Sequence, residues 1–506
     1  MTEKITIGVV GAGTMGRGIV QLFAKAGHVV RCYDTQPGAA TKAVDYVDGM
    51  FARAVEKGNM AESELAVARE RLRACSSVAD LADCALVIEA IVEDIEAKRA
   101  LFRELEEWVG EETILASNTS SLTVADIAAA CRRPQRVAGL HFFNPVPLMK
   151  VVEVIAAVRT DSEVVQRLSG LVEATGHRAV VTADQPGFLV NHAGRGLYTE
   201  GLRIVEEQVA SPADVDDLLR EAMGFRMGPF ELLDLTGLDV SSRVMTSIYE
   251  QFHHEPRFRP SALVGPRVAA GLFGRKSGEG WYKYADGQQQ KLPSQTIPLL
   301  PEALTVWIDP LASGVSGLRE LVTAAGCRVA GCPDDADLAI VQPWGLDATS
   351  TAMSIGLDAT RCVAVDPLPP LSLRRTLMLT AVTTADARNA AHALLANDGT
   401  AVTVINDSPG FVCQRVMATI VNIAGNIAQR GIASVVDLED AVRLGLGYPQ
   451  GPLGWGDQLG AGRMLEILRA QLVCTGDPRY RPSAWLSRRV ALGVSLTTLE
   501  AVRHER

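Results

Sequence analysis

The sequence predicts a doubly wound α/β sheet domain followed by an all-α domain, and then a degenerate, shortened repeat of both. Three observations lead to this prediction. The first is the order of strand, glycine triplet, helix and strand at the amino terminus. The second is the alternation of strands and helices that follows, and the third is that several segments recur in the second half of the chain. A chain of 506 residues exceeds what one hydrophobic core serves, so several domains are expected.

The composition is that of a globular protein and excludes several classes of partner. Hydrophobic residues make up 47% of the chain, and the net charge of -10 comes without any block of lysine or arginine. We therefore expect no nucleic-acid partner and no membrane partner. The nine cysteines form no C-x-x-C pair and no Cys/His cluster at zinc spacing, and no signal peptide or long apolar span is present. This pattern predicts reduced thiols, a cytoplasmic protein and no metal site.

The amino terminus carries the first specific motif. A buried strand, Ile5 to Val10, is expected to turn through three glycines into a helix, and a second strand, His28 to Tyr33, leads to an acid. In a Rossmann-type domain such glycines allow a tight turn and close approach of a pyrophosphate to backbone N–H groups, and the acid accepts hydrogen bonds from the adenosine ribose. The predicted cofactor-binding residues of this motif are Gly11, Gly13, Gly16 and Asp34.

Asp34 also predicts which nicotinamide cofactor is bound. A carboxylate at this position repels a ribose 2'-phosphate, and the next residues, Thr35, Gln36 and Pro37, include no arginine that would pair with one. The sequence therefore predicts NAD rather than NADP.

Further polar residues gather where strands are expected to end. Strands that alternate with helices indicate a parallel sheet, whose ligands bind outside the carboxyl ends of the strands. The residues near such ends are Glu89, Glu93, Asn118, Ser120 and His141. For any one of them, surface polarity or helix capping is a sufficient explanation. The prediction of a site therefore rests on their convergence at one edge of the sheet.

Six segments resemble the L-3-hydroxyacyl-CoA dehydrogenase family in order and near-spacing. They are GAGTMGRGI, EAIVEDIEAKRALF, SNTSSL, GLHFFNPVPLMKVVEVI, DQPGFLVN and GPFELLDLTGLDV, and the resemblance covers about the first 285 residues. It implies that His141 is the catalytic base and that Glu153 is its partner carboxylate. The further active-site residues that it implies are Ser120, Asn191 and Asn144, and those expected near the cofactor are Glu93, Lys98, Asn118 and Ser120.

The chemistry of alcohol oxidation gives a reason for pairing His141 with Glu153. Hydride transfer to a nicotinamide requires a group that accepts the hydroxyl proton, and imidazole suits this at neutral pH. A carboxylate on the other ring nitrogen fixes the tautomer and stabilises the imidazolium. Taken alone, the stretch from Gly139 to Ile155 favours a buried histidine satisfied by an acid, and it is the surrounding motifs that favour catalysis.

The resemblance implies NAD-dependent oxidation of (S)-3-hydroxyacyl-CoA to 3-oxoacyl-CoA, in fatty acid or phenylacetate catabolism. The long, two-part chain is similar to bacterial 3-hydroxybutyryl-CoA and 3-hydroxyadipyl-CoA dehydrogenases, and the acyl group stays open between them. Arg195, Arg203 and Arg226 are candidates for binding a dicarboxylate tail only because of the domain in which they lie. The alternative is a non-enzymatic, crystallin-like structural or binding protein, against which the full set of site residues argues.

The second half repeats the first without its chemical groups. DQPGFLV recurs as DSPGFVC, but Pro310 and Ala312 stand in place of glycines and Gln414 replaces Asn191. We therefore expect one NAD site per chain, and a pseudo-dimer of the two helical domains within the chain, with association between chains left open. The predicted ranges are 1–184 for the Rossmann domain, 185–287 for the first helical domain, 288–303 for a linker, 304–406 for the degenerate Rossmann-like domain and 407–506 for the second helical domain.

Overall fold

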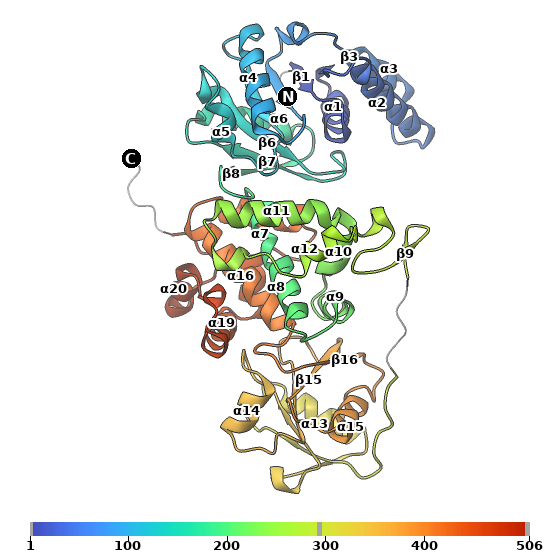
Figure 1. Ribbon diagram of the computed structural model, residues 1–506, viewed down its shortest axis with the longest axis vertical. Coiled ribbons are helices and arrows are strands. Elements are labelled where there is room, and N and C mark those ends of the chain that lie inside the picture. The colour runs from blue at the N-terminus through green and yellow to red at the C-terminus, as the bar shows by residue number, and fades with distance from the viewer. Residues whose placement is uncertain (1–3, 291–295, 501–506) are drawn as a thin grey trace. The chain divides into compact units, whose positions relative to one another are not determined.

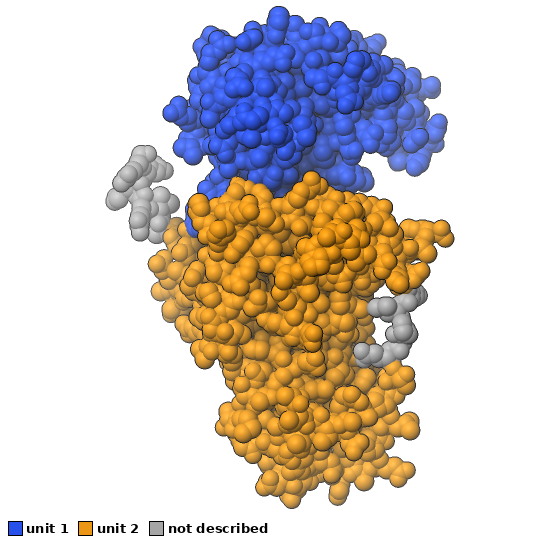
Figure 2. Space-filling model, viewed as in Figure 1, with its two compact units in different colours: residues 1–192, 430–446 blue, residues 193–429, 447–506 orange. Residues whose placement is uncertain are grey.

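The computed structural model describes residues 4–290 and 296–500, which form two compact units (Figures 1 and 2). The first unit comprises Met1–His192 together with Arg430–Leu446, and the second comprises Ala193–Gln429 together with Gly447–Arg506. Residues 430–446 lie inside the range 407–506 that was predicted as one domain, yet they cluster with the amino-terminal unit. The predicted linker 288–303 includes residues 291–295, which lie outside the described residues.

The first unit is built on an eight-stranded sheet with the order β3-β2-β1-β4-β5-β6-β7-β8. All neighbouring strands run parallel except β6 and β7, which are antiparallel. The strands are β1 (Thr6–Val10), β2 (Val29–Tyr33), β3 (Leu72–Ala74), β4 (Leu86–Glu89), β5 (Ile114–Ser117), β6 (Val137–Phe142), β7 (Val151–Ala156) and β8 (Arg178–Ala183). The helices are α1 (Thr14–Ala26), α2 (Ala39–Glu56), α3 (Glu62–Arg71), α4 (Ile95–Trp108), α5 (Val124–Ala128), α6 (Ser162–Glu173), α17 (Val435–Gly445) and the short α7 (Val190–Ala193), which crosses the boundary between the units.

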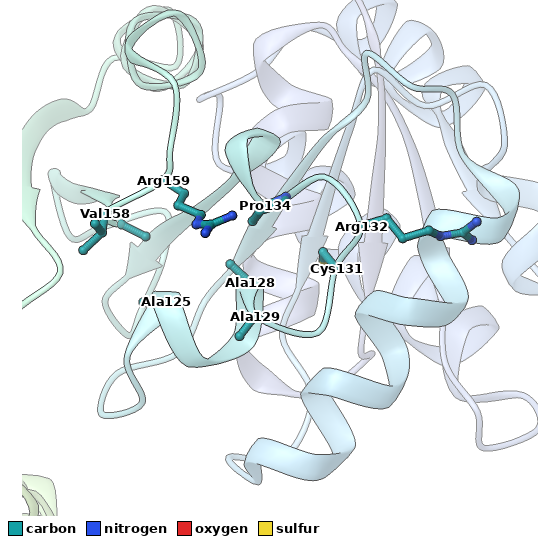
Figure 3. A pocket seen from close by; sticks show the side chains of 9 residues that line it. Ala125, Ala128, Ala129, Cys131, Arg132, Pro134, Val158 and Arg159 are labelled. Atoms are coloured by element: carbon teal, nitrogen blue, oxygen red, sulfur yellow. The ribbon is translucent and has the colours of Figure 1, made fainter.

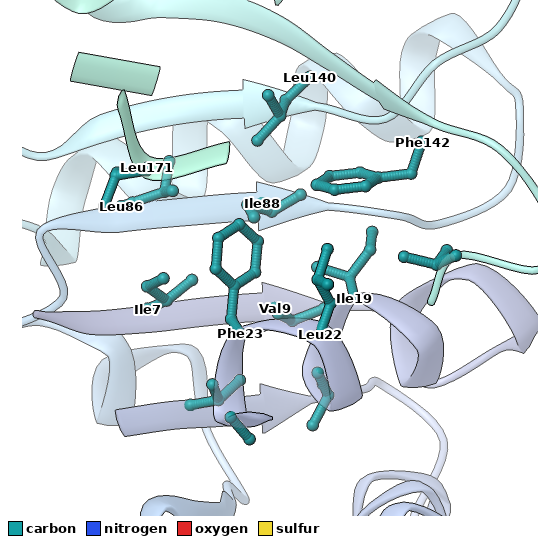
Figure 4. Close-up of a cluster of buried hydrophobic side chains, with 14 of the residues drawn as sticks. Ile7, Val9, Ile19, Leu22, Phe23, Leu86, Ile88, Leu140, Phe142 and Leu171 are labelled. Atoms are coloured by element: carbon teal, nitrogen blue, oxygen red, sulfur yellow. The ribbon is translucent and has the colours of Figure 1, made fainter. Parts of the chain in front are cut away.

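Helices cover both faces of this sheet, as the doubly wound prediction requires. One core combines strand residues with side chains from α1, α2 and α6, and a second core combines them with α4 and α5. In the first core Phe23 and Phe142 meet edge to face, with ring centroids 6.1 Å apart (Figure 4). Because side chains alternate along a strand, burying Leu140 and Phe142 in this core turns His141 toward the opposite face.

The second unit contains two sets of helices and a second sheet. The helices of the first set are α8 (Arg195–Glu206), α9 (Pro212–Glu221), α10 (Pro229–Thr236), α11 (Leu238–Gln251) and α12 (Val264–Ala269). Those of the second set are α16 (Cys413–Gln429), α18 (Pro452–Leu459), α19 (Ala461–Thr475) and α20 (Ala484–Leu492). Helices α8 and α16 lie side by side (Figure 1). They approach closely because Gly196 has no side chain: an ideal Cβ there would lie 3.1 Å from the Cα of Ile420.

The second sheet has six strands in the order β12-β11-β13-β14-β15-β16. Only β14 and β15 are antiparallel. The strands are β11 (Thr305–Ile308), β12 (Arg328–Val329), β13 (Leu338–Val341), β14 (Cys362–Val365), β15 (Arg375–Leu379) and β16 (Val402–Ile405), with α13 (Val315–Ala324), α14 (Ala348–Ser354) and α15 (Ala385–Leu395) between them. A two-stranded hairpin of β9 (Tyr284–Ala285) and β10 (Gln288–Gln289) precedes this sheet, so the predicted linker begins inside a paired strand.

A buried ion pair joins α8 to α16. The Nε of Arg415 lies 2.7 Å from Oε1 of Glu200, and the two side chains are 2% and 1% exposed. Arg415 also donates to Glu207 and to the hydroxyl of Tyr480. Several hydrogen bonds thus offset the cost of burying this guanidinium. Its removal would leave the carboxylate of Glu200 buried without its ion pair.

Replacing Arg415 with Met is therefore expected to lower the free energy of unfolding of the second unit by about 3–5 kcal/mol, because Glu200 stays buried without its main partner. Urea unfolding followed by tryptophan fluorescence measures this. Arg243→Met, which breaks a solvent-exposed pair with Asp239 on α11, is the matched control and should cost at most about 1 kcal/mol. An Arg415→Met loss no larger than that of the control would contradict the argument.

Candidate active site

His141 and Glu153 face each other across the antiparallel pair β6 and β7. They occupy directly opposite positions in the register, and Nδ1 of His141 lies 2.5 Å from Oε2 of Glu153. His141 is 5% exposed and Glu153 is fully buried. Because an ionised carboxylate only accepts hydrogen bonds, it holds the proton on Nδ1 and leaves the lone pair on Nε2. The sequence prediction that these two residues pair is consistent with this geometry.

The other oxygen of Glu153 is held by backbone groups. Its Oε1 accepts the N–H groups of Leu189 (2.9 Å) and Val190 (2.7 Å), at the start of α7. These donors stabilise a charge that has no access to water, and they fix the rotamer from which the carboxylate reaches His141. The segment after the Pro-Gly turn at 186–187 thus positions the dyad through its main chain.

The three predicted asparagines occupy different positions around this dyad. Oδ1 of Asn118 accepts the N–H of Phe142 at 2.8 Å, which ties the end of β5 to the strand that carries His141. Asn191 is half-buried and follows Val190 directly, so it extends from the segment that clamps Glu153. Asn144 is exposed on the turn between β6 and β7, where a cis peptide bond joins it to Pro145.

Glu93 organises the loop that follows β5 and carries Ser120. Its Oε1 accepts the hydroxyl of Thr119 (2.7 Å) and the N–H groups of Ser120 (2.9 Å) and Ser121 (3.0 Å). Partial burial alone would raise the pKa of this carboxyl, but the charge of Lys98 and the hydrogen bonds from this loop outweigh burial and lower the pKa. An ionised Glu93 therefore fixes the backbone of Ser120.

Lys98 is buried between two carboxylates. Its Nζ lies 2.6 Å from Oε1 of Glu89 and 3.2 Å from Oε2 of Glu93, and its side chain is 1% exposed. Glu89 in turn accepts the hydroxyl of Ser117 at 2.6 Å, from the neighbouring strand end. Lys98 was predicted to lie near the cofactor; in the structure it is linked through Glu93 to the loop that carries Ser120.

The glycine loop after β1 has the geometry that a dinucleotide requires. Gly11 has φ +106°, and an ideal Cβ there would lie 2.4 Å from the carbonyl oxygen of Ala90. A Cβ on Gly16 would lie 1.8 Å from the carbonyl oxygen of Gly11, so this glycine permits the close contact of α1 with β1. Around Gly13 there is open space, as a pyrophosphate approaching the backbone needs.

Asp34 stands at the end of β2 against the same loop. Its Oδ2 accepts the N–H of Ala12 at 2.7 Å, and its Oδ1 accepts the N–H of Gln36 at 2.8 Å. A carboxylate has about four lone-pair sites, so it can still accept ribose hydroxyls. The residues present therefore fit a dinucleotide.

A separate pocket of about 420 Å³ lies beside α5 in the first unit (Figure 3). Its lining comes from α5 and from residues 129–134 and 157–159, and none of the predicted site residues is among them. Alanine, proline and valine side chains form much of the wall, and neither an imidazole nor a carboxylate lines it.

Sequence reasoning missed several groups that hold the site. Thr119 and Ser121 bind Glu93, and their only signal was the run of hydroxyl residues in SNTSSL. The N–H groups of Leu189 and Val190 carry no side-chain signal at all. The contribution of residues 430–446 to the first unit had no local signal either, because the repeat indicates a helix but not its neighbour.

Comparison with known proteins gives matches over nearly the whole chain. The model described as "3-hydroxyacyl-CoA dehydrogenase, NAD binding domain" matches residues 6–185, and "3-hydroxyacyl-CoA dehydrogenase, C-terminal domain" matches residues 187–284 and 410–498. The chain is 36% identical to 3-hydroxyadipyl-CoA dehydrogenase of Escherichia coli over 97% of this chain and 98% of that protein. It is 40% identical to a probable 3-hydroxybutyryl-CoA dehydrogenase of Bacillus subtilis over 55% of this chain and 96% of the relative. The crystal structure of 3-hydroxybutyryl-CoA dehydrogenase from Escherichia coli K12 matches with a TM-score of 0.85 and 35% identity, over 97% of this chain and 99% of the other.

Fold, glycine loop and these matches define an NAD-dependent oxidoreductase. The chain belongs to the 3-hydroxyacyl-CoA dehydrogenase family. The predicted family and the predicted cofactor, NAD, are thereby confirmed. Within residues 4–290 and 296–500, no helix has the length and apolar character needed to cross a membrane.

The clamp of Glu93 on the serine loop predicts a change in hydrogen exchange. In Glu93→Ala the amide of Ser120 loses its carboxylate acceptor, so we expect it to exchange about tenfold faster, the equivalent of one lost hydrogen bond. Mass spectrometry of the peptide spanning 118–123 measures this. Glu96→Ala removes an exposed neighbour that pairs only with Arg99 among the described residues and serves as control. Equal exchange in the two variants would show that Glu93 does not hold the loop.

Proposed function

We propose that the chain oxidises the hydroxyl of an (S)-3-hydroxyacyl-CoA to give 3-oxoacyl-CoA and NADH, in the breakdown of fatty acids or phenylacetate. The observation that carries this proposal is the pairing of His141 and Glu153 at 2.5 Å, which leaves Nε2 of the imidazole as a base. The names of the relatives support the acyl-CoA class of substrate.

His141 accepts the proton of the substrate hydroxyl on Nε2 and becomes an imidazolium. Glu153 stabilises that charge and keeps the ring in place, since its own position is fixed by two backbone N–H groups. Bound NAD supplies the hydride acceptor. The Ser120 hydroxyl and the Asn191 amide donate to the substrate oxygen as charge develops on it, and Asn144 is assigned to the same site.

The glycine loop and its neighbours hold the cofactor in this proposal. Gly11 and Gly13 give the pyrophosphate access to backbone N–H groups, Gly16 permits close packing of α1, and Asp34 accepts the ribose hydroxyls. Glu93 and Asn118 line the cofactor side of the strand ends. Lys98 contributes by holding Glu93 ionised, because its own amine is buried.

The acyl group stays open between a short monocarboxylate chain and a dicarboxylate chain. The guanidinium of Arg203 is engaged by Glu207 (2.6 Å) and Asp477 (3.3 Å), which argues against it as a ligand for a terminal carboxylate. Arg195 is buried beside the ring of Tyr198, and Arg226 is exposed. A non-enzymatic, crystallin-like role is not favoured, because the dyad and its clamp are complete.

The second half is, in this proposal, a shortened counterpart of the first that binds no nicotinamide, and the five predicted ranges describe the two halves. Pro310 and Ala312 stand in the loop after β11, and the N–H of Gly314 at the start of α13 is taken by Oε1 of Gln342 at 2.7 Å. A phosphate would have to displace that bond. Equal spacing from the DQPGF and DSPGF segments puts Thr376 at the position of Glu153.

Near Thr376, the amide of Gln414 is engaged by neighbouring groups, whereas Oγ1 of Thr376 and Oδ2 of Asp366 make no hydrogen bond with the described residues. Gln414, the counterpart of Asn191, donates to Oδ1 of Asp366 at 2.9 Å and accepts the N–H of Gly345 at 2.8 Å. Gln414 and Asp366 are both buried, and burial raises the pKa of Asp366 to about 7. The contact of α8 with α16 supports a pseudo-dimer of the two helical sets within one chain.

Replacing His141 with Gln is expected to lower kcat by about a hundredfold to ten-thousandfold, the usual contribution of a general base, with NAD affinity little changed. NADH absorbance with 3-hydroxybutyryl-CoA and 3-hydroxyadipyl-CoA measures turnover and also compares the acyl groups. His253→Gln, on an exposed turn, is the control and should stay within about twofold. More than a tenth of wild-type turnover in His141→Gln would refute the assignment.

Calorimetric titration is expected to give one NAD per chain. Asp34→Ala should weaken that site at least about tenfold and relax discrimination against NADP, because a charge-assisted hydrogen bond contributes roughly 1.5–3 kcal/mol. Asp309→Ala, in the loop after β11, should leave NAD affinity unchanged. Two NAD sites per chain, or an effect of Asp309→Ala equal to that of Asp34→Ala, would show that the second sheet binds the cofactor.

A further inference from the structure

We infer that residues 430–446, which the second half of the chain contributes to the first unit, are a positioning element for the His141–Glu153 dyad. The inference rests on the proposed function, since it concerns the same site. It assigns to the second half a role in catalysis that its own degenerate sheet does not have.

Residues 430–446 pair with the free edge of the sheet that carries His141 and Glu153. Strand β8 is the last in the order, so its outer backbone groups would otherwise be unpaired. The N–H of Ala183 donates to the carbonyl oxygen of Ile432 at 2.7 Å, and a bridge joins Thr182 to Ala433. A hydrogen bond from Arg430 to Gln185, at 2.9 Å, extends this contact toward the Pro-Gly turn.

Ion pairs fix α17 against the same strand. Arg178, the first residue of β8, lies 2.7 Å from Oδ1 of Asp437 and 2.9 Å from Oδ2 of Asp440. In the register β8 pairs with β7, where Arg178 is opposite Val151 and Val180 is opposite Glu153. The helix therefore braces the two strands that carry and flank the catalytic carboxylate.

The carboxyl end of α17 touches the clamp itself. An ideal Cβ on Gly445 would lie 3.0 Å from both methyl carbons of Val190 and 3.2 Å from one of Val151. The N–H of Val190 is the shorter of the two backbone hydrogen bonds to Glu153, at 2.7 Å. In this inference the close approach of Gly445 to the Val190 side chain positions Val190. The N–H of Val190 then positions Glu153, and Glu153 positions His141.

The chain contains its own control for this arrangement. On the second sheet the N–H of Asn406 donates to the carbonyl oxygen of Val209 at 2.9 Å, just before α9. There Arg374 takes the part of Arg178, at 2.9 Å from Glu221 and 3.6 Å from Asp217. Each sheet thus receives a helix from the helical set of the other half, but only the first sheet carries a dyad.

The first experiment compares Arg178→Ala with Arg374→Ala in the full chain, using the NADH assay. We expect kcat to fall about tenfold in Arg178→Ala and to stay within about twofold in Arg374→Ala, because displacing a catalytic group by a fraction of an ångström carries a penalty of this order. KM for NAD should be unchanged in both. The acidic limb of the kcat–pH profile should move to lower pH in Arg178→Ala, since a loosened Glu153 stabilises the imidazolium less.

A purely structural contact would instead reduce activity only through the folded fraction, with an unchanged pH profile and a lower melting temperature. Gly445→Ala covers the case in which Arg178→Ala fails to fold. Alanine is a better helix former than glycine, so the melting temperature should hold or rise while kcat falls about threefold to tenfold.

Val190→Ala removes the methyl groups but keeps the N–H that Glu153 accepts, so it tests the route of the effect. In that background, adding Gly445→Ala should lower kcat less than it does alone, because only the contact of the new methyl with Val151 remains. Unchanged kcat in both Arg178→Ala and Gly445→Ala would overturn the inference. So would equal losses in Arg178→Ala and Arg374→Ala. Failure of wild-type turnover would instead count against the proposed function.

Discussion

A fully buried carboxylate, that of Glu153, is held by the N–H groups of Leu189 and Val190 and holds His141 in turn. Moving a carboxylate out of water is unfavourable by several kcal/mol unless donors replace the lost hydration, and here a helix start and an imidazole do so. The strand register that puts His141 opposite Glu153, the turn at 186–187 and the packing of α17 all serve to meet this requirement.

A second set of linked charges connects the ends of β4 and β5 in the first unit. Lys98 lies between Glu89 and Glu93, and Glu93 fixes the backbone of the loop with Ser120. A single buried ammonium thus pairs with two carboxylates, those of Glu89 and Glu93. One of these carboxylates, Glu89, accepts the hydroxyl of Ser117 on the neighbouring strand, and the other, Glu93, orients the loop with Ser120. Lys98 therefore links a carboxylate that stabilises the sheet, Glu89, to a carboxylate that orients a loop, Glu93.

The sequence was sufficient for the parts that side-chain chemistry determines. The glycine spacing predicted the dinucleotide loop, and the family resemblance paired His141 with Glu153 before any register was known. It was not sufficient for groups that act through the backbone, such as the N–H of Val190, since any residue but proline supplies one. Nor did the composition of α4 distinguish a buried Lys98 from a lysine at the cofactor. Those distinctions depend on which face of an element is covered.

If the second half is a shortened counterpart of the first, as proposed, the exchange of helices between the halves gives a reason for it to keep its framework without the chemistry. Asp407 caps α14 through the N–H groups of Ala348 and Thr349, as Asp184 does for α5, so the connection between sheet and helices is the same in both halves. What differs is Pro310 in the loop after β11 and Gln414 in place of Asn191. If the second half stabilised only its own sheet, the contacts of Asp407 with α14 would not affect the His141–Glu153 dyad. The same half also supplies α17, which packs against β8. In the inference above, weakening the contacts of that half would therefore also loosen the helix that supports Glu153.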